Sequence, residues 1–540
     1  MKKYFIVTAI IILGISTLKA QNTDQNMPRL VKKGQSVQLW VDNKPFLILG
    51  GELGNSSASS ADYMKPIWPK LKKMDVNTVF TPVYWELMEP AEGKFNFRLL
   101  DDAILSARKN NIKLALLWFG SWKNSMSCYA PAWVKTNILR FPRAEDKNNV
   151  KQEILTPFSK NNLLADKQAF VKLSEHLKTF DGKMHTVIAI QVENEIGMLP
   201  NARTYDAGAN RAFRQTVPQL LLNYLKNNKD NLLPETKAIW AGNGYQTSGN
   251  WEEIFGKSLA TEELFMAWYY ARYVNEIAQA GKKAYNLPMY LNAALNAPGK
   301  KPGEYPSAGP LPQVMDAWKA GAPAIDIFAP DFYNPDFKHW SDLYTRSASS
   351  LFIPEIRFEP GVDAKAFFAF GNYNCISFSP FSIESTQKPE AEPIGKTYHI
   401  LKQVTPLLTR YNHADAIRGF LCNKDSSAQK TTLGNYVLTI THEYKLGWEV
   451  GAKNPVWPQT GVLIINTAPN EYYVAGTGVV ITFEPVLKGR AGFLSIDEGS
   501  FINDQWVPRR RMNGDQDHQG RHVRIPVDEY SIRHVKLYSY

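Results

Sequence analysis

Two acidic residues, Glu195 and Glu355, stand where apolar β-type segments end. The run 186–190 leads into Asn194-Glu195, and the run 351–353 leads through a proline into Glu355. Side chains at the carboxyl ends of the strands form the catalytic face of a (β/α)8 barrel. Two carboxyl groups there can cleave a glycosidic bond, one by protonating the leaving oxygen and one by attacking the anomeric carbon. We therefore predict Glu195 as the acid/base and Glu355 as its partner, and expect Asn194 to hydrogen-bond a sugar 2-hydroxyl.

The elements that would position these residues are short apolar segments alternating with helix-like ones, a pattern typical of a parallel α/β fold. Eight such strands would close a barrel. A further apolar segment, 237–241, is interpreted as a strand-like part of an insertion. Helices are expected at 165–180, 262–280 and 396–412, where apolar residues recur at helical spacing. The eight expected strands are 46–50, 76–83, 112–119, 186–192, 288–292, 325–328, 351–355 and 375–378.

After the expected helix 396–412 the pattern changes to short β-rich runs separated by turn residues, which is typical of a β-sandwich. Its expected role is packing on the barrel, with sugar binding as the alternative. The fold class is therefore α/β, a (β/α)8 TIM barrel followed by a C-terminal β-sandwich. The expected organisation is an export signal over 1–20, a barrel over 21–412 and the sandwich over 413–540. The β-rich runs are 436–442, 461–467, 471–475, 478–483, 492–497 and 532–538.

The N-terminus has the pattern of an export signal. Lys2 and Lys3 precede the apolar run 5–18, and a cleavage site follows Ala20. No later stretch is long and apolar enough to span a membrane. We therefore expect an exported protein, periplasmic or secreted, without membrane insertion.

Composition points to no other function class. The 540 residues carry a net charge of +11, but the tight basic run Arg509–Arg511 stands alone, so no nucleic-acid partner is expected. The oligomeric state is not readable. Three widely spaced cysteines do not form a disulfide framework. His518 and His522 lie four residues apart in a loop without other ligands, so we expect no metal, and no phosphate or dinucleotide motif predicts a cofactor.

Two irregular stretches are placed to shape a cleft. Residues 298–312 contain five prolines and three glycines, so they can form neither a helix nor a central strand. They follow the fifth expected strand and should therefore lie over the catalytic face. The polar stretch 143–162 follows the third expected strand and is expected to do the same.

A third segment, 84–97, carries a resemblance to a known family. It reads Tyr-Trp-Glu-Leu-Met-Glu-Pro-Ala-Glu-Gly-Lys-Phe-Asn-Phe. With the Asn194-Glu195 pair and Glu355, it resembles the retaining (β/α)8 glycosidases, and within them the β-galactosidases of families 35 and 42. The resemblance covers roughly residues 47–381. It implies that Glu195 is the acid/base and Glu355 the nucleophile of a retaining mechanism.

The resemblance also implies contacts around this pair. Tyr333 would hydrogen-bond the nucleophile, with an ordinary buried tyrosine as the alternative. Glu52 and Asn292 end the first and fifth expected strands, and each could bind sugar hydroxyls or pair with a basic residue. The aromatic residues that would contact the sugar ring, or else belong to the core, are Tyr84, Trp85 and Trp122.

The chain departs from family 35 at two motifs. Family 35 usually has Ala-Glu-Trp where this chain has Gly120-Ser121-Trp122, so a glutamate that contacts galactose is missing. It also usually has Asn-Leu-His-Glu-Pro where residues 86–90 read Glu-Leu-Met-Glu-Pro. The 160 residues between Glu195 and Glu355 are closer to family 42. The chain therefore resembles a divergent family-35-like branch, with retaining hydrolysis more secure than galactose as the sugar.

The expected function is that of an exported retaining exo-glycosidase, a β-galactosidase that trims oligosaccharide or polysaccharide substrates without a metal. Glu195 is expected to be protonated at rest, its pKa raised by ionised Glu355. Either glutamate alone would fit a salt-bridged strand end, but both together with Asn194 favour a catalytic pair. Two alternatives remain: a β-glycosidase for glucosides, mannosides or glucosaminides on the same barrel, and a non-catalytic sugar-binding protein.

Overall fold

The computed structural model describes residues 26–34, 36–346, 350–411 and 415–540. The predicted export signal, residues 1–20, lies outside the described residues, and so does the predicted boundary at 412/413. Among the described residues, no helix is long and apolar enough to cross a membrane.

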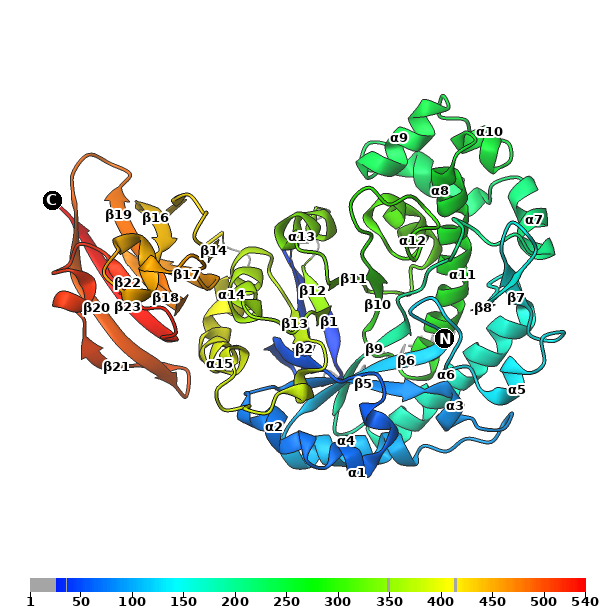
Figure 1. Ribbon diagram of the computed structural model, residues 1–540, viewed down its shortest axis with the longest axis horizontal. Coiled ribbons are helices and arrows are strands. Elements are labelled where there is room, and N and C mark those ends of the chain that lie inside the picture. Colours follow the sequence, from blue (N-terminus) through cyan, green and yellow to red (C-terminus); the bar gives the residue numbers. More distant parts are fainter. Residues whose placement is uncertain (1–25, 35, 347–349, 412–414) are drawn as a thin grey trace, which may run out of the picture.

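The first and larger part of the chain is a closed barrel of eight parallel strands, as the sequence predicts (Figure 1). Each observed strand overlaps one expected segment. The strands are mostly apolar because both of their faces are covered, by the barrel interior on one side and by helices on the other; polar residues gather toward their carboxyl ends. They are β4 (Ile48–Glu52), β5 (Thr78–Tyr84), β6 (Lys113–Lys123), β9 (Val187–Asn194), β10 (Met289–Ala294), β11 (Ile327–Phe332), β12 (Phe352–Ile356) and β13 (Ser377–Pro380).

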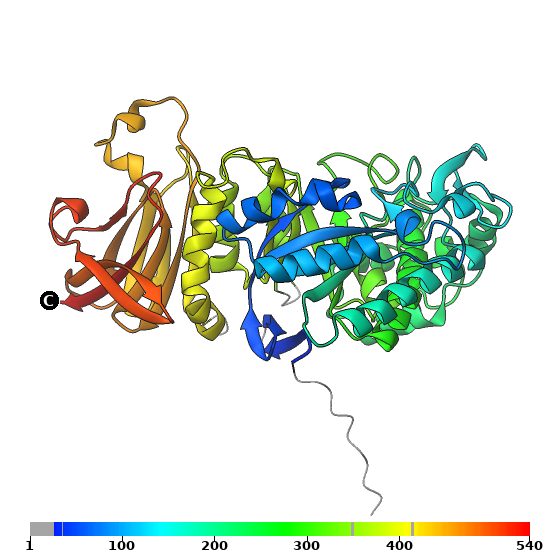
Figure 2. The same ribbon diagram turned by 90° about the horizontal axis from the view of Figure 1, so that it is seen from below.

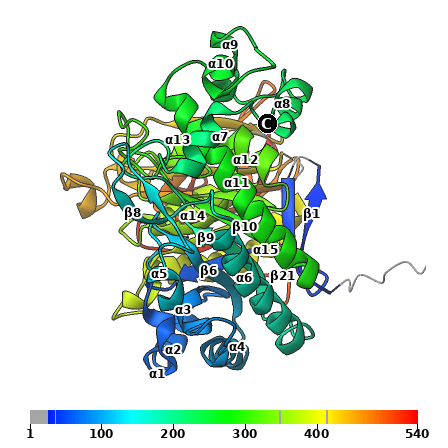
Figure 3. The same ribbon diagram turned by 90° about the vertical axis from the view of Figure 1, so that its right-hand side faces the viewer.

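Helices surround the barrel, and the three expected helices are present. Two long ones, α6 (Lys160–Phe180) and α11 (Leu259–Ala284), pack against each other (Figure 3). Serine side chains at Ser159 and Ser258 cap their first turns, satisfying amide groups that the helix leaves free. The other main helices are α4 (Arg98–Asn110), α12 (Met315–Gly321), α13 (Phe337–Thr345), α14 (Val362–Asn372) and α15 (Pro393–Tyr411).

The segment 237–241 is a helix, so its interpretation as a strand is wrong. It lies in α9 (Pro234–Gly242), which begins with a proline in its first turn, where the fixed φ of proline suits a helix. A short apolar run cannot distinguish a strand from a buried helix by periodicity alone. It does belong to an insertion between β9 and β10, formed with α7 (Ala207–Arg214), α8 (Gln219–Asn227) and α10 (Trp251–Phe255) (Figure 1, green).

A small antiparallel sheet that the sequence analysis did not predict lies at the amino-terminal end of the barrel strands. It consists of β1 (Arg29–Lys33), β2 (Ser36–Val41) and β3 (Lys44–Phe46). The Val37 amide donates to Ser350 Oγ at 2.8 Å just before β12. Figure 2 shows this sheet (blue) on the side of the barrel opposite the loops that follow the strands.

The C-terminal part is the expected β-sandwich. Its two sheets enclose a separate apolar core that includes Tyr436, Ile464 and Val535. The four-stranded sheet is β15 (Gln429–Leu433), β16 (Tyr436–His442), β19 (Val479–Pro485) and β22 (Val523–Ile525). The six-stranded sheet is β14 (Ile417–Cys422), β17 (Thr460–Ala468), β18 (Glu471–Thr477), β20 (Ala491–Ile502), β21 (Gln505–Arg511) and β23 (Ser531–Ser539).

The outer face of the six-stranded sheet packs on α14 and α15. Leu463, Ile465 and Tyr473 of this sheet belong to the same apolar cluster as the barrel. Gly371 of α14 meets Gly419 of β14, and a Cβ on Gly371 would lie 2.7 Å from Gly419 Cα. Two glycines are therefore required where this helix and this strand approach most closely. The predicted packing role of the sandwich is confirmed.

Candidate active site

The carboxyl ends of the barrel strands bring the two predicted carboxylates to one cavity. It has a volume of about 300 Å³, and Glu195 and Glu355 both line it together with Lys123, Asn124 and Tyr333. Glu195 follows the last residue of β9, while Glu355 lies in β12. This arrangement places two carboxyl groups within reach of one bound molecule.

The predicted cover over this face is present. Pro306, from the proline-rich stretch 298–312, lines the cavity. The stretch is held by Ser307, which forms a backbone bridge with Met198 beyond β9. Residues 143–155 form a hairpin of β7 (Arg143–Glu145) and β8 (Lys151–Leu155). The proline-rich stretch therefore lies at the catalytic face, as expected. The hairpin contacts the end of β6 through the Leu155 carbonyl, which accepts from the Trp122 indole, but its residues do not line the cavity, and residues 160–162 belong to α6.

Glu355 is held by Tyr333, as the resemblance implies. The Tyr333 hydroxyl donates a hydrogen bond to Glu355 Oε1. Glu355 is 4% exposed, and Tyr333 lies at the rim of the cavity beneath the Arg357 guanidinium, 5.4 Å from its ring. A donor fixed on one carboxylate oxygen orients the carboxyl group and favours its ionised form.

Glu195 is held by its backbone and by Asn124. Its amide donates to Asn292 Oδ1 at 2.9 Å, and Asn124 Nδ2 donates to its carboxyl group. Its φ of +44° lies in the left-handed region, which a residue with a side chain enters only when neighbouring contacts fix it. These contacts point the Glu195 side chain into the cavity at the end of β9.

Asn292 is a positioning residue in this structure. Its Oδ1 accepts from the Glu195 amide, and its Nδ2 donates to Asp331 Oδ2 at 2.6 Å. Both ends of the amide are thereby used inside the protein. The partners of Asn292 are thus a backbone amide and a carboxyl group, not the basic residue that was one of the two expectations; contact with a sugar hydroxyl stays a prediction.

Two further buried carboxyl groups, those of Glu52 and Asp331, lie beside the two that line the cavity. Burial is the main cause that raises the pKa of all four. The pKa of Glu355 rises to about 7, through burial and then through the charge of Glu195. Burial raises the pKa of Glu195. The charge of Glu355, which we expected to raise this pKa, is not the cause. Interacting carboxyl groups of this kind take up protons as a set rather than independently.

Two members of this set act as neutral neighbours. Glu52 hydrogen-bonds Glu355 and Asp331 hydrogen-bonds Glu195. Among the described residues, Glu52 Oε1 and Asp331 Oδ1 are buried without a donor, which is costly for an ionised oxygen. A proton on each acid removes this cost, because each then donates to its catalytic neighbour. Glu52 is 1% exposed and does not line the cavity. We expected it to bind sugar hydroxyls or to pair with a basic residue, but its hydrogen-bond neighbour is a second carboxyl group, that of Glu355.

Lys123 supplies positive charge to this acidic site, and the sequence analysis missed it. It is 5% exposed and its charge lowers the pKa of all four carboxyl groups. An irregularity in the pairing of β6 with β9 between Trp118 and Lys123 brings Lys123 opposite Asn194. Lys123 directly follows Gly120-Ser121-Trp122, where the chain departs from family 35. This departure was the signal in the sequence that could have pointed to Lys123.

Asn194 lies fully buried beside the cavity. Within the described part of the chain, neither Oδ1 nor Nδ2 of this side chain has a hydrogen-bond partner. Buried amides are normally paired. Asn194 is an exception, so its side chain has hydrogen-bonding capacity that the described residues do not use. Its predicted bond to a sugar hydroxyl stays a prediction.

The three aromatic residues expected at the sugar ring are core residues. Trp85 and Trp122 are completely buried, and their indole N–H groups donate to Glu89 at 2.8 Å and to the Leu155 carbonyl at 3.1 Å. Tyr84 is 4% exposed and donates to the Asn55 carbonyl. None of the three lines the cavity. Their rings pack on other aromatic side chains instead, Tyr84 on Tyr129, Trp85 on Trp133, and Trp122 on Tyr270 and Tyr273.

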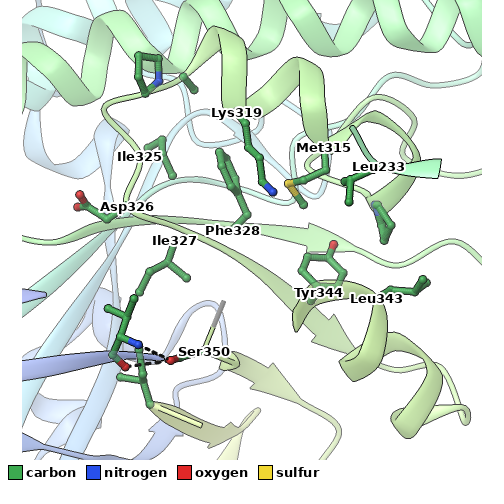
Figure 4. Close-up of a pocket in the computed structure, with 15 residues that line it drawn as sticks. Leu233, Met315, Lys319, Ile325, Asp326, Ile327, Phe328, Leu343, Tyr344 and Ser350 are labelled. Atoms are coloured by element: carbon green, nitrogen blue, oxygen red, sulfur yellow. Dashed lines mark hydrogen bonds between the residues drawn. The ribbon is translucent and has the colours of Figure 1, made fainter. Parts of the chain in front are cut away.

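A second cavity, of about 280 Å³, lies elsewhere and does not compete for the chemistry (Figure 4). Lys319 of α12, Phe328 at the start of β11 and Tyr344 of α13 line it. The start of β11 is the amino-terminal end of that strand, away from the catalytic face. Its described lining contains one carboxylate, Asp326, so it lacks the pair that the first cavity has.

Residues 58–267 match a family model for glycoside hydrolase family 42, described as "Beta-galactosidase". The matched part includes Glu195 and ends before Glu355. Residues 394–524 match a model described as a domain of unknown function (DUF5597), so most of the sandwich carries no functional description. The predicted likeness to family 35 finds no support in these matches and stays a prediction.

The chain is also similar to named β-galactosidases. One from Xanthomonas manihotis is 26% identical over 243 residues, 43% of this chain and 37% of that protein. Solved structures from Marinomonas ef1 (13% identical, TM-score 0.45) and Bacillus circulans sp. alkalophilus (14%, 0.46) cover 67% and 66% of this chain, and 60% and 56% of theirs. The chain thus spans less than two thirds of the length of these relatives.

Proposed function

We propose that this protein is a retaining β-glycosidase of the β-galactosidase type. The observation that carries this proposal is that Glu195 and Glu355, from β9 and β12, line one cavity at the carboxyl ends of the barrel strands. A pair of carboxyl groups across one site is the equipment of retaining glycosidases. The family 42 match over residues 58–267 supports it independently.

The first step forms a covalent glycosyl–enzyme bond. A Glu355 oxygen attacks the anomeric carbon, and the bond from that carbon to the leaving oxygen breaks as Glu195 gives its proton to that oxygen. In the second step, Glu195 takes a proton from water, and the resulting hydroxide attacks the same carbon and releases Glu355. Two inversions at one carbon leave the product with the configuration of the substrate.

The surroundings of the pair support this division of roles. Glu355 must be ionised to attack, and the Tyr333 hydroxyl and the nearby Lys123 charge both favour that form. Glu195 must carry a proton at the start. Burial raises its pKa, and this effect exceeds the lowering by Lys123, Asp331 and Asn124. A residue that donates a proton near neutral pH needs such a raised pKa.

We propose galactose as the sugar, because the matched family model and the curated relative both carry the name β-galactosidase. The substrate class we propose is a galactose-terminated oligosaccharide or polysaccharide fragment, attacked from its end. The proline-rich cover around Pro306 supports attack at a chain end, because it limits the cavity on one side. Glucosides, mannosides and glucosaminides are the competing substrates.

The test is a panel of aryl β-glycosides with the anomer of the first-formed product followed by NMR. We expect β-galactoside turnover with the β-anomer formed first, abolished in Glu355→Gln. Glu195→Ala should slow substrates with poor leaving groups far more than activated aryl glycosides. Glu92→Gln, at an exposed ion pair with Arg140, is the matched control.

Three results would overturn parts of this proposal. Near-normal turnover by Glu355→Gln would remove its role as nucleophile, and an inverted first product would remove the retaining mechanism. Sugar binding without turnover of any glycoside would favour the non-catalytic alternative. Faster turnover of another glycoside than of the galactoside would change the sugar but keep the mechanism.

We also propose that the protein is exported, because residues 1–20 have the pattern of an export signal. Expression of the full gene with its own N-terminus should place the mature protein outside the cytoplasm, starting at Gln21. A cytoplasmic protein that retains Met1 would contradict this.

A further inference from the structure

An exposed tryptophan stands on the C-terminal domain, far along the chain from the catalytic residues. Trp448 is 49% exposed and belongs to the segment 443–459, which joins β16 to β17. Exposed tryptophans carry a large apolar ring and therefore mark contact surfaces more often than other residues do. The neighbours of Trp448 determine whether its ring has a fixed orientation on which a ligand can stack.

The Trp448 ring is braced from one side by Arg524. The guanidinium carbon lies 5.3 Å from the ring centroid. The guanidinium is fixed in turn by two carboxylates, donating to Glu443 at 2.9 Å and to Glu449 at 2.6 Å. Glu443 is almost fully buried. The brace is rigid, and its positive charge is balanced within the protein.

Two histidines form the border of the ring. His518 lies 5.1 Å from Trp448 at 89°, and His522 lies 5.8 Å away at 39°. His522 is 4% exposed, and among the described residues its Nε2 is buried without a hydrogen-bond partner. Burial lowers the pKa of His522 to about 4, so it is neutral at pH 7. A buried imidazole nitrogen beside the aromatic ring is therefore left with hydrogen-bonding capacity that the described residues do not use.

The chemistry of this site favours a neutral sugar ring. A pyranose has an apolar C–H face that stacks on an indole and hydroxyl groups around its edge that take hydrogen bonds. A nucleic acid would also stack, and Arg521 beside His518 is a positive charge that could attract it. The two carboxylates Glu443 and Glu449, however, neutralise Arg524 beside the ring, and this disfavours a phosphate backbone there. A purely apolar partner would leave His522 Nε2 unpaired.

The site faces the same way as the active site. Figure 2 shows the segment 443–459 (gold to orange) on the side of the molecule that carries the turn 57–59 and α1 (Ala61–Met64), which follow β4. The amino-terminal β1–β3 sheet lies on the opposite side. A long substrate could therefore reach from this segment toward the barrel along one side of the molecule.

We propose that Trp448, His518 and His522 form a carbohydrate-binding platform that holds a neutral, pyranose-containing polysaccharide. That this polysaccharide is also the substrate of the barrel rests on the proposed function. Binding at a second site raises the local concentration of chain ends at the active site without changing the chemistry. The platform should therefore affect polysaccharides and leave small glycosides unaffected.

The test is electrophoresis of the full-length Glu355→Gln protein in native gels containing neutral galactan, xyloglucan or mannan. We expect at least one of these polysaccharides to retard the protein, and Trp448→Ala to reduce the retardation by about tenfold in apparent affinity. His518→Ala is a second variant that weakens the border while leaving the ring and Arg524 in place. Leu487→Ala, at an 82% exposed residue of the same domain, is the matched control.

The readout on activity uses proteins with Glu355 intact. Trp448→Ala should lower kcat/KM on the retarding polysaccharide by about tenfold and leave aryl glycoside turnover unchanged. Failure of the proposed function appears as absent aryl glycoside turnover, which does not affect the gel result. The platform is refuted if no neutral polysaccharide retards the protein, if Trp448→Ala and His518→Ala bind like Leu487→Ala, or if only single-stranded DNA retards it.

Discussion

Replacement of Lys123 by methionine should move the pH dependence of the enzyme to higher pH. Lys123 is 5% exposed and faces four carboxyl groups, those of Glu52, Glu195, Asp331 and Glu355. Two unit charges about 6 Å apart interact by roughly 3 kcal/mol at an effective dielectric constant of about 20, which equals about two pKa units. Methionine keeps the unbranched shape and most of the length of the side chain, and removes the ammonium group with its charge and its N–H donors.

The direction of the change follows from the roles of the two glutamates. Glu355 works ionised, so activity is lost as the pH falls through its pKa, which is about 7 in the presence of Lys123. Without Lys123 this pKa is higher, and the acidic limb of kcat/KM moves up by one to two units on this order-of-magnitude reasoning. Glu195 works protonated, so the alkaline limb moves in the same direction.

The assay is the pH profile of kcat/KM on an aryl galactoside from pH 4 to 10, with Lys123→Arg as the control that keeps the charge. Thermal unfolding at each pH excludes loss of the fold. A Lys123→Met profile that is lower at every pH but unmoved along the pH axis would refute the reasoning. It would mean that Lys123 contacts the substrate without tuning the carboxyl groups.

Two further predictions concern neighbours of the pair. Asp331→Asn should retain activity within about tenfold, because an amide can replace a neutral acid between Asn292 and Glu195. Asp331→Ala should lose roughly 10- to 100-fold in kcat/KM. Equal losses in kcat/KM for the two variants would show that Asp331 works ionised. Trp122→Ala should lower the free energy of unfolding by about 3–5 kcal/mol, because the indole is completely buried, as measured by urea unfolding. Unchanged stability with reduced sugar affinity would restore Trp122 as a sugar contact.

The strands and the two carboxylates were predictable because their signals are local. A barrel strand covered on both faces is a run of apolar residues, and a polar residue at its carboxyl end is visible in the sequence. Thus 186–190 predicted β9, and Glu195 followed from it. The same reasoning placed Glu355 after 351–353, and the resemblance supplied its contact with Tyr333.

The residues missed by the sequence analysis depend on contacts between distant segments. Lys123 enters the site through an irregular pairing of β6 with β9, and a single strand does not reveal such a shift. Asp331 lies beyond the end expected for its strand, at 328, and becomes a neighbour of Glu355 only through the pairing of β11 with β12. Trp85 and Trp122 were placed at the sugar because residue type cannot tell whether a ring turns toward the cavity or the core.

The contact between Gly371 and Gly419 lies in an apolar interface that joins the barrel to the sandwich. The helix α14 directly follows β12, the strand that carries Glu355, and its Asp363 accepts a hydrogen bond from Tyr530 at 2.6 Å. A barrel cut off after α15 would expose an apolar helical face that the six-stranded sheet normally covers, and such a surface favours aggregation. The sandwich and the catalytic strand are therefore linked through α14, and a chimera that replaces either part would have to preserve this surface.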